Sequence, residues 1–210
     1  MNIPNGVKTE TLNNLEFEAG LILKNKFTSS SEFDKDTDVL CATTGGIRVV
    51  VSANKQAIAF DGVLENTAGV ERVIGYTASV QFSTKEVDSE KVKLALGYAG
   101  ITSTTGKDTI TLKQGVIPET EYTDFYVLGK LGDGTWRQVV INNAMNVGGL
   151  NETRNSKGET EIAFDLQANY TIDTQDTPPV SIEYITEAEP EPEPEPTPEP
   201  EQTQGEGGQE

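Results

Sequence analysis

The chain has 210 residues, of which 24% are charged, and its net charge at pH 7 is −18. It contains no histidine and one cysteine, Cys41. These counts exclude a Cys–His or Ser–His catalytic pair, an internal disulfide and a zinc site built from Cys or His. A nucleic-acid-binding protein needs a basic stripe for the phosphates, and we find none in this acidic sequence.

Residues 1–15 are polar and lack the apolar stretch of a signal peptide. We expect them to form an N-terminal arm. No apolar run in the chain is long enough to span a bilayer, so we expect no membrane insertion and synthesis in the cytoplasm.

A long polar segment, residues 25–40, follows the first expected strand at residues 20–25. A second one covers residues 61–73. Loops of this length in a compact β domain are usually functional or disordered. We therefore treat both as candidate functional segments.

The first of these loops contains Asp34, Asp36 and Asp38 in a D-x-D-x-D pattern. An EF-hand loop opens in this way, but it requires Gly at its sixth position and Glu at its twelfth. Those positions hold Val39 and Gly45. We interpret the run as a solvated acidic loop, with weak calcium binding as the alternative.

Three residues separate Cys41 from the pair Gly45-Gly46. A reactive thiol needs a base or a cationic neighbour, and the nearby cations are Arg48 and Lys55. Free cysteine is commonly buried as a small apolar residue. We interpret Cys41 as a packing residue at the start of a strand, and we do not expect an enzyme.

Alternation of apolar and polar residues predicts a mainly β body. The expected strands after residue 46 cover residues 47–52, 56–60, 76–84, 108–113, 123–129, 136–142 and 160–171. Two of them have clear polar faces, which consist of Thr77, Ser79, Gln81 and Ser83 in one strand and Glu161, Asp165, Gln167 and Asn169 in the other.

Turn signals predict two hairpins. Gly132-Asp133-Gly134 joins residues 123–130 to 135–142, and residues 155–158 join 149–154 to 159–170.

Residues 88–96 predict one short helix that flanks the sheet. Asp88 is suited to its N-cap and Gly97 to its C′ position. Val92, Ala95 and Leu96 give it an apolar stripe that would cover one end of the β body.

The segment 187–210 contains nine Glu and six Pro and no basic residue. It has almost no apolar surface to bury, so we expect a disordered acidic tail with extended, polyproline-like character. Removing its charge leaves −9 for residues 1–186, which we expect to form the folded domain.

The order of the segments resembles the major tail proteins, or tail tube proteins, of long-tailed bacteriophages. The likeness covers most of residues 16–185. Its most telling parts are CATTGG at residues 41–46 and the stretch from Asp61 to Gly69. It continues through the helix, the TDFYVLGKLGDGTWRQVVIN hairpin and the segments at 157–171 and 176–185.

This resemblance implies a β-sandwich or barrel-like subunit that forms rings, with six copies expected, and stacks them into a tail tube. The tube would be the conduit for DNA ejection and part of the virion. The implied partners are further copies of the chain, a tape-measure protein, a tail terminator, tail-tip or baseplate proteins, and DNA in transit. No cofactor is implied.

Within such a tube, both polar strand faces named above are candidates for the lumen wall, with bulk solvent as the alternative. The first long loop is a candidate contact to the next ring, through Ser30, Phe33, Asp34, Asp36 and Asp38. Whether a sheath surrounds the tube is left open. The alternative function is a monomeric β-sandwich module for binding or adhesion, with a Pro-rich stalk.

Overall fold

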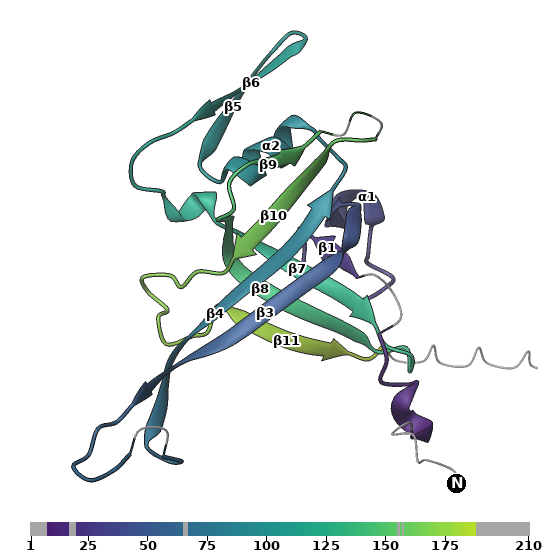
Figure 1. The fold of residues 1–210 in the computed structure, drawn as a ribbon. Coiled ribbons are helices and arrows are strands. Elements are labelled where there is room, and N and C mark those ends of the chain that lie inside the picture. Colours follow the sequence, from purple (N-terminus) through teal and green to yellow (C-terminus); the bar gives the residue numbers. More distant parts are fainter. Residues whose placement is uncertain (1–7, 17–19, 65–66, 155, 157, 188–210) are drawn as a thin grey trace, which may run out of the picture.

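The computed structural model describes residues 8–16, 20–64, 67–154, 156 and 158–187 (Figure 1). The predicted acidic tail, apart from Glu187, therefore lies outside the described residues, as does half of the predicted N-terminal arm. The fold is mainly β, as the alternation predicted. Its strands are β1 Leu21–Leu23, β2 Val39–Cys41, β3 Thr43–Ala57, β4 Glu71–Thr84, β5 Ala99–Thr104, β6 Lys107–Leu112, β7 Thr123–Lys130, β8 Trp136–Asn146, β9 Asn151–Thr153, β10 Glu161–Gln167 and β11 Val180–Ile185.

Antiparallel pairing joins these strands in the order β2-β1-β7-β8-β10-β4-β3. β8 pairs β11 from Trp136 to Ile141, β7 from Trp136 to Ala144, and β10 at its last two residues. The sheet therefore divides at β8 into two parts, β1-β7-β8-β11 and β10-β4-β3. Outside this sheet, β5 and β6 form a separate two-stranded ribbon.

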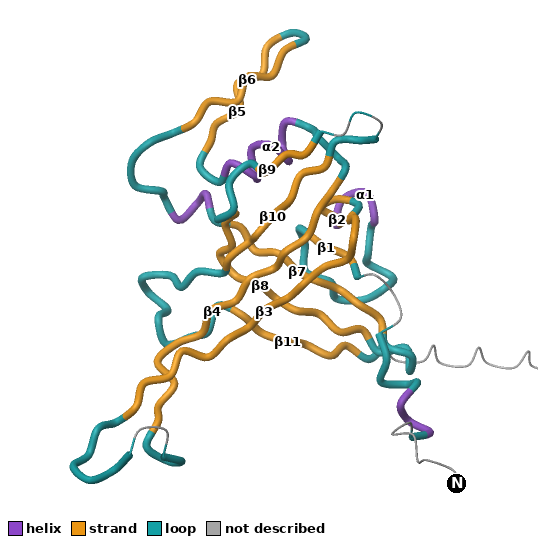
Figure 2. The backbone as a smooth tube through the Cα atoms, viewed as in Figure 1, coloured by secondary structure: helices purple, strands orange, loops and turns teal. Residues whose placement is uncertain are grey.

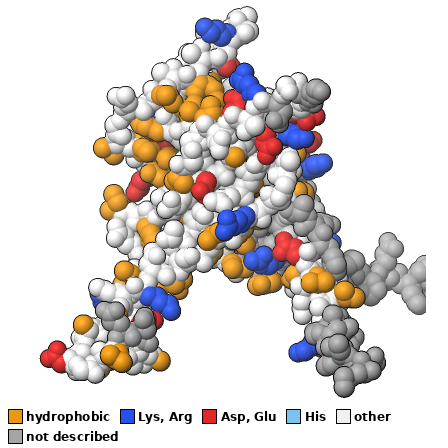
Figure 3. Space-filling view, viewed as in Figure 1, with side chains coloured by type: hydrophobic (Ala, Val, Ile, Leu, Met, Phe, Trp, Pro, Cys, Tyr) orange, Lys and Arg blue, Asp and Glu red, His pale blue; other side chains and the backbone are white. Residues whose placement is uncertain are grey.

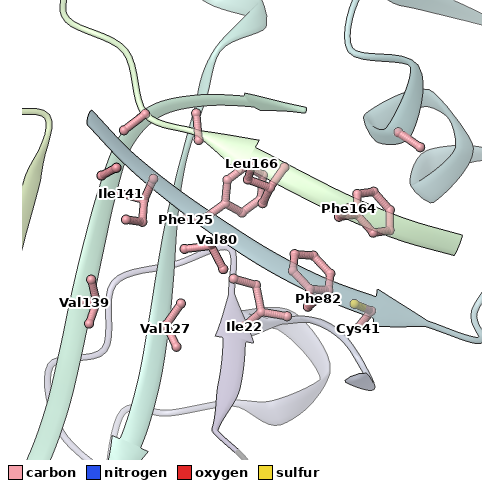
Figure 4. Packing of buried hydrophobic residues seen from close by; sticks show 14 of the residues in the cluster. Ile22, Cys41, Val80, Phe82, Phe125, Val127, Val139, Ile141, Phe164 and Leu166 are labelled. Atoms are coloured by element: carbon pink, nitrogen blue, oxygen red, sulfur yellow. The ribbon is translucent and has the colours of Figure 1, made fainter. Parts of the chain in front are cut away.

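The main core lies between the two parts of the sheet (Figure 4). Phe82 of β4 stacks on Phe164 of β10 with ring centroids 4.9 Å apart. From the other part of the sheet, Ile22, Val127 and Val139 point into the same cluster. This packing explains the alternation, since every second residue of each strand faces the core.

A second, smaller cluster lies on the opposite face of β1, β7 and β8. Leu23 and Leu128 are its strand residues, and Phe27 and Phe33 of the first long loop cover them. Because Ile22 and Leu23 are neighbours in one strand, the two clusters lie on opposite sides of that sheet part. The molecule is thus layered from β10-β4-β3, through the main core and β1-β7-β8, to the loop 25–40.

The predicted helix is confirmed as α2, Ser89–Leu96. Asp88 is its N-cap and accepts a hydrogen bond from the backbone N–H of Lys91 at 2.8 Å. Gly97 follows with a positive φ of 73°, where its backbone N–H donates to the carbonyl of Leu94. Ala95 is buried in the main core, so α2 covers one end of it.

Several details differ from the sequence predictions, among them the following. The strand predicted at 47–52 and the first two residues of the one predicted at 56–60 belong to one strand, β3, which ends at Ala57. β4 begins at Glu71, inside the predicted loop 61–73, because residues 71–75 pair with the end of β3. The prediction of a single helix was also wrong, since α1, Lys35–Asp38, forms within the first long loop.

Both predicted hairpins are confirmed. β7 and β8 pair across a turn in which the N–H of Leu131 donates to the carbonyl of Thr135 at 2.9 Å. β9 and β10 pair around residues 155–158, of which 155 and 157 are not described. The described part of the N-terminal arm includes a short 3₁₀ helix, Thr9–Thr11, and then contacts the β7–β8 turn, where Gly132 N–H donates to the carbonyl of Leu15.

Candidate functional site

The two polar strand faces predicted from sequence form one continuous surface. β4 and β10 are hydrogen-bonded neighbours, with Gln81 opposite Asp165 and Ser79 opposite Gln167. The same face continues onto β3, where Arg48 lies opposite Gln81. We call the outer surface of β3, β4 and β10 the polar face; it is turned toward the viewer in Figures 1 and 3.

Side-chain hydrogen bonds cross all three strands of the polar face. Arg48 donates to Gln81 Oε1 at 3.4 Å, and Gln81 Nε2 donates to Asp165 Oδ2 at 3.1 Å. Toward the C-terminal end of β3, Asn54 Nδ2 donates to Thr77 Oγ1 of β4 at 3.1 Å. These cross-strand bonds hold the amide and hydroxyl groups in fixed rows.

The polar face carries little charge for a protein this acidic. Across the outward positions of residues 48–52, 77–83 and 161–167, the charged side chains are Arg48, Glu161 and Asp165. Figure 3 shows the same surface as mainly uncharged atoms with a few charged side chains. Hydroxyl and amide groups therefore dominate it.

Asn169 is used differently from the other predicted lumen residues. It lies beyond the end of β10, and its Nδ2 donates to the backbone carbonyls of Asn143 and Gln167, both at 2.9 Å. Its amide therefore fastens the chain to the end of β8. Thr77, Ser79, Gln81, Ser83, Glu161, Asp165 and Gln167 remain together on the polar face.

A shallow hollow of about 640 Å³ lies at one end of the polar face. Its lining includes Gln81, Ser83 and Asp165, together with Gly45 and Gly46 of the CATTGG motif. Both glycines have positive φ, 78° and 88°, and they fall where the β3–β4 register shifts between Thr44 and Ile47. The glycine pair thus permits a bulge that bends the edge strand.

Cys41 is buried, as predicted, with 5% of its surface exposed. Burial raises the pKa of its thiol to about 11, and a hydrogen bond with Thr84 only partly opposes this. The thiol therefore stays protonated at neutral pH, which agrees with a packing role. Among the described residues, no group of three or more His, Cys, Asp or Glu side chains could hold a metal ion.

The acidic residues of the first long loop stabilise the loop itself. Asp34 is the N-cap of α1 and accepts from the N–H of Asp36 at 3.0 Å. Asp38 accepts from Asn25 Nδ2 at 2.8 Å and from the N–H of Asp34 at 2.9 Å. The hydrogen bond from Asn25 is the main reason that the pKa of Asp38 lies below its ordinary value.

This loop is fastened to its own subunit. The backbone N–H of Phe27 donates to Oε1 of the buried Gln138 at 2.8 Å. Phe33 packs with Phe27, whose ring lies 5.0 Å from that of Trp136. The start of the loop and Phe33 are therefore fixed on their own subunit, and a contact from this loop to another ring stays a prediction.

The sequence analysis missed a projecting arm, formed by residues 54–57 of β3, residues 71–75 of β4 and the loop between them, of which residues 58–64 and 67–70 are described (Figures 1 and 2). Apolar side chains at its end are exposed, including Phe60 at 58% and Leu64 at 82%. Figure 3 shows hydrophobic atoms at this end of the molecule. The signal was present in the sequence, since apolar residues stand on both sides of the turn at Asp61-Gly62. The exposed apolar residues of the arm are Ile58, Phe60, Val63, Leu64, Val73 and Ile74.

No family model matches the sequence, and no curated protein matches it. Among solved structures, a chain in the virion of a native gene transfer agent (GTA) particle is similar, with a TM-score of 0.38 and 13% identity. A chain in the tail of an empty GTA particle with C6 symmetry gives a TM-score of 0.39 and 14% identity. Each match covers 73% of this chain and 92% of the other. Both likenesses are remote at these values.

Among the described residues, no helix has the length and apolarity to cross a bilayer.

Proposed function

We propose that this chain is the subunit of a bacteriophage tail tube, a structural virion protein that assembles into rings, with six copies expected, and then into stacked rings. The observation that carries the proposal is the polar face, which spans three strands and ends at an open edge. Its open strand, β3, is 15 residues long. Among the described strands, β3 pairs only with β4.

A long open edge favours pairing with another chain. It presents a row of unpaired backbone N–H and C=O groups, and closure into a barrel is the arrangement that removes such edges. On the core side of β3, Val51 lies opposite the buried Ala78 but is itself 41% exposed. A neighbouring subunit on this edge would cover Val51 and extend the polar face around a ring.

The chemistry of the polar face suits the inner wall of such a ring. DNA is a polyanion, and basic side chains would bind its phosphates and retard its passage. Hydroxyl and amide groups with few charges would neither bind the phosphates tightly nor repel them strongly. We therefore assign Thr77, Ser79, Gln81, Ser83, Glu161, Asp165 and Gln167 to the lumen, and Asn169 to the rim.

The arm supplies the second contact of the assembly. Exposed apolar side chains gathered at one place mark an interaction site. The arm projects from the body along the direction of β3 and β4, so its end lies away from the rest of the subunit and is open to contact with another one (Figure 2). We assign it the main contact with another subunit of the tube. The predicted inter-ring residues Ser30, Phe33, Asp34, Asp36 and Asp38 would contribute only through their exposed atoms.

Electron microscopy of the purified protein over a concentration series, with light-scattering mass, tests this function. We expect hollow rings or tubes. Val51→Lys should block ring closure while the subunit stays folded, because Val51 is already partly exposed. Val116→Lys is the matched control, since Val116 is 93% exposed and lies outside the polar face and the arm.

Two results would contradict the proposal. One is a monomer at every concentration, even after a tail-tip complex is added as an initiator, which would favour the monomeric binding module. The other is tube formation that Val51→Lys and Val116→Lys leave equally intact, which would exclude pairing at the β3 edge.

A further inference from the structure

The acidic tail begins at a defined position on the body. The backbone N–H of Ser30, in the first long loop, donates a hydrogen bond to the carboxylate of Glu187. Glu187 follows β11 by two residues and is the first glutamate of the Glu-Pro segment. The loop and the base of the tail, 157 residues apart in sequence, therefore meet directly.

Two further groups face this carboxylate. Hydrogen bonding to the Ser30 side chain and then to its backbone N–H are the largest causes that lower the pKa of Glu187, and the Trp136 indole and the Lys130 ammonium lower it further. Lys130 Nζ lies 4.7 Å from the centre of the Trp136 ring. The indole Nε1 is buried and has no hydrogen-bond acceptor in good geometry among the described residues. The Ser30 N–H thus binds the carboxylate directly, and an indole N–H without an acceptor and a neighbouring ammonium group are near enough to lower its pKa.

We propose that Ser30, Trp136 and Lys130 form a carboxylate-binding site whose ligand is Glu187, and that this site anchors the acidic tail. Donors of these three kinds stabilise an ionised carboxylate, since each offers an N–H and Lys130 adds a positive charge. The site gives the first long loop a role within its own subunit.

Neighbouring contacts hold the loop in the position that the site needs. Gln138 Nε2 donates to Glu183 Oε2 at 3.1 Å, while its Oε1 accepts from Phe27. Lys26 Nζ donates to Glu183 Oε1 at 2.7 Å. The loop is therefore tied to both β8 and β11 just before it reaches Ser30.

The site lies on the far side of the molecule from the polar face. Phe27 and Phe33 flank Ser30 in sequence and belong to the second cluster, across β1-β7-β8 from the main core. If the polar face lines a lumen, which rests on the proposed function, the tail leaves from the outer surface of the tube. Each ring of six would then display 54 tail glutamates outside, because each tail has nine.

The single tryptophan of the chain makes the site measurable in the intact protein. Trp136 fluorescence, titrated with acid, should show a transition with a midpoint below the ordinary pKa of glutamate, and Glu187→Ala should remove it. Glu189→Ala, the next glutamate of the tail, is the matched control. It should keep the transition.

Amide hydrogen exchange at Ser30 provides a second readout. The exchange rate should rise in Glu187→Ala and stay unchanged in Glu189→Ala. Because Glu187 is exposed, neither substitution should unfold the subunit. A wild-type titration without the transition, or a transition that survives in Glu187→Ala, would overturn the site whether or not tubes form.

Cysteine labelling tests the outward position separately. Cys41 is buried and protonated, so a cysteine introduced by Gly205→Cys or by Ser79→Cys is the reactive one. In tubes, a maleimide carried on a large polyethylene glycol should label Gly205→Cys fully and Ser79→Cys hardly at all. Protection of Gly205→Cys in tubes would overturn the outward tail. Absence of tubes would instead count against the proposed function.

Discussion

Gln138 offers the sharpest test of how the first long loop is held. Its side chain is fully buried. Its Oε1 accepts the Phe27 N–H at 2.8 Å, and its Nε2 contacts the Phe27 carbonyl at 3.4 Å and Glu183 Oε2 at 3.1 Å. We choose Gln138→Leu because leucine has a similar size, so that lost hydrogen bonds rather than a cavity dominate the effect.

The expected cost follows from which partners lose their hydrogen bond. Phe27 is buried, and an unpaired buried N–H costs roughly 1–3 kcal/mol. Glu183 keeps its ion pair with Lys26, and the contact to the Phe27 carbonyl is long, so these add little. We therefore expect Gln138→Leu to lower the free energy of unfolding by about 2–3 kcal/mol.

Urea unfolding followed by Trp136 fluorescence measures this change, since the midpoint should fall while the slope stays constant. Limited proteolysis should cut the loop 25–40 sooner in the variant. Gln56→Leu is the matched control, because Gln56 is exposed on the arm and its Oε1 accepts from Arg72. It should cost less than about 0.5 kcal/mol. A Gln138→Leu protein as stable as this control would refute the reasoning.

Three further predictions concern the core, the helix and the cysteine. Phe164→Ala should cost roughly 3–5 kcal/mol in urea unfolding, because it removes the ring stacked on Phe82 from a buried site; a cost below about 1 kcal/mol would contradict this packing. Asp88→Ala should cost about 1 kcal/mol at pH 7 through loss of the N-cap of α2. Partial burial raises the pKa of Asp88, but hydrogen bonds from the Lys91 side chain and N–H outweigh it and hold the pKa below its ordinary value. The stabilisation is therefore present above the ordinary pKa of aspartate and lost as the pH falls through the lowered pKa. In thermal melts from pH 7 into acid, the melting temperatures of Asp88→Ala and of the unmodified protein should converge. A difference that stays constant would count against the cap. Cys41 should react with a thiol reagent at pH 8 only after unfolding, because burial raises the pKa of its thiol to about 11; rapid labelling of the native protein would show that this end of the core opens.

The sequence by itself determined the local features of this protein. Alternation identifies a strand because successive side chains of a strand point to opposite faces, whatever its partner is. Turn residues and helix caps act over a few positions, so the hairpins and α2 could be predicted from Gly132-Asp133-Gly134, Asp88 and Gly97. The burial of Cys41 followed from its residue type and the absence of histidine.

Only the tertiary structure decided which of these features lie together. β4 and β10 pair across 84 residues from Gln81 to Asp165, and this register turns two separate polar rows into one face. The loop 25–40 is held by a hydrogen bond from Phe27 to Gln138, 111 residues away. An alternating strand offers an edge to many partners, and the best partner depends on how the whole core closes. The polar face, the arm and the anchor of the tail are therefore products of long-range packing that no local pattern contains.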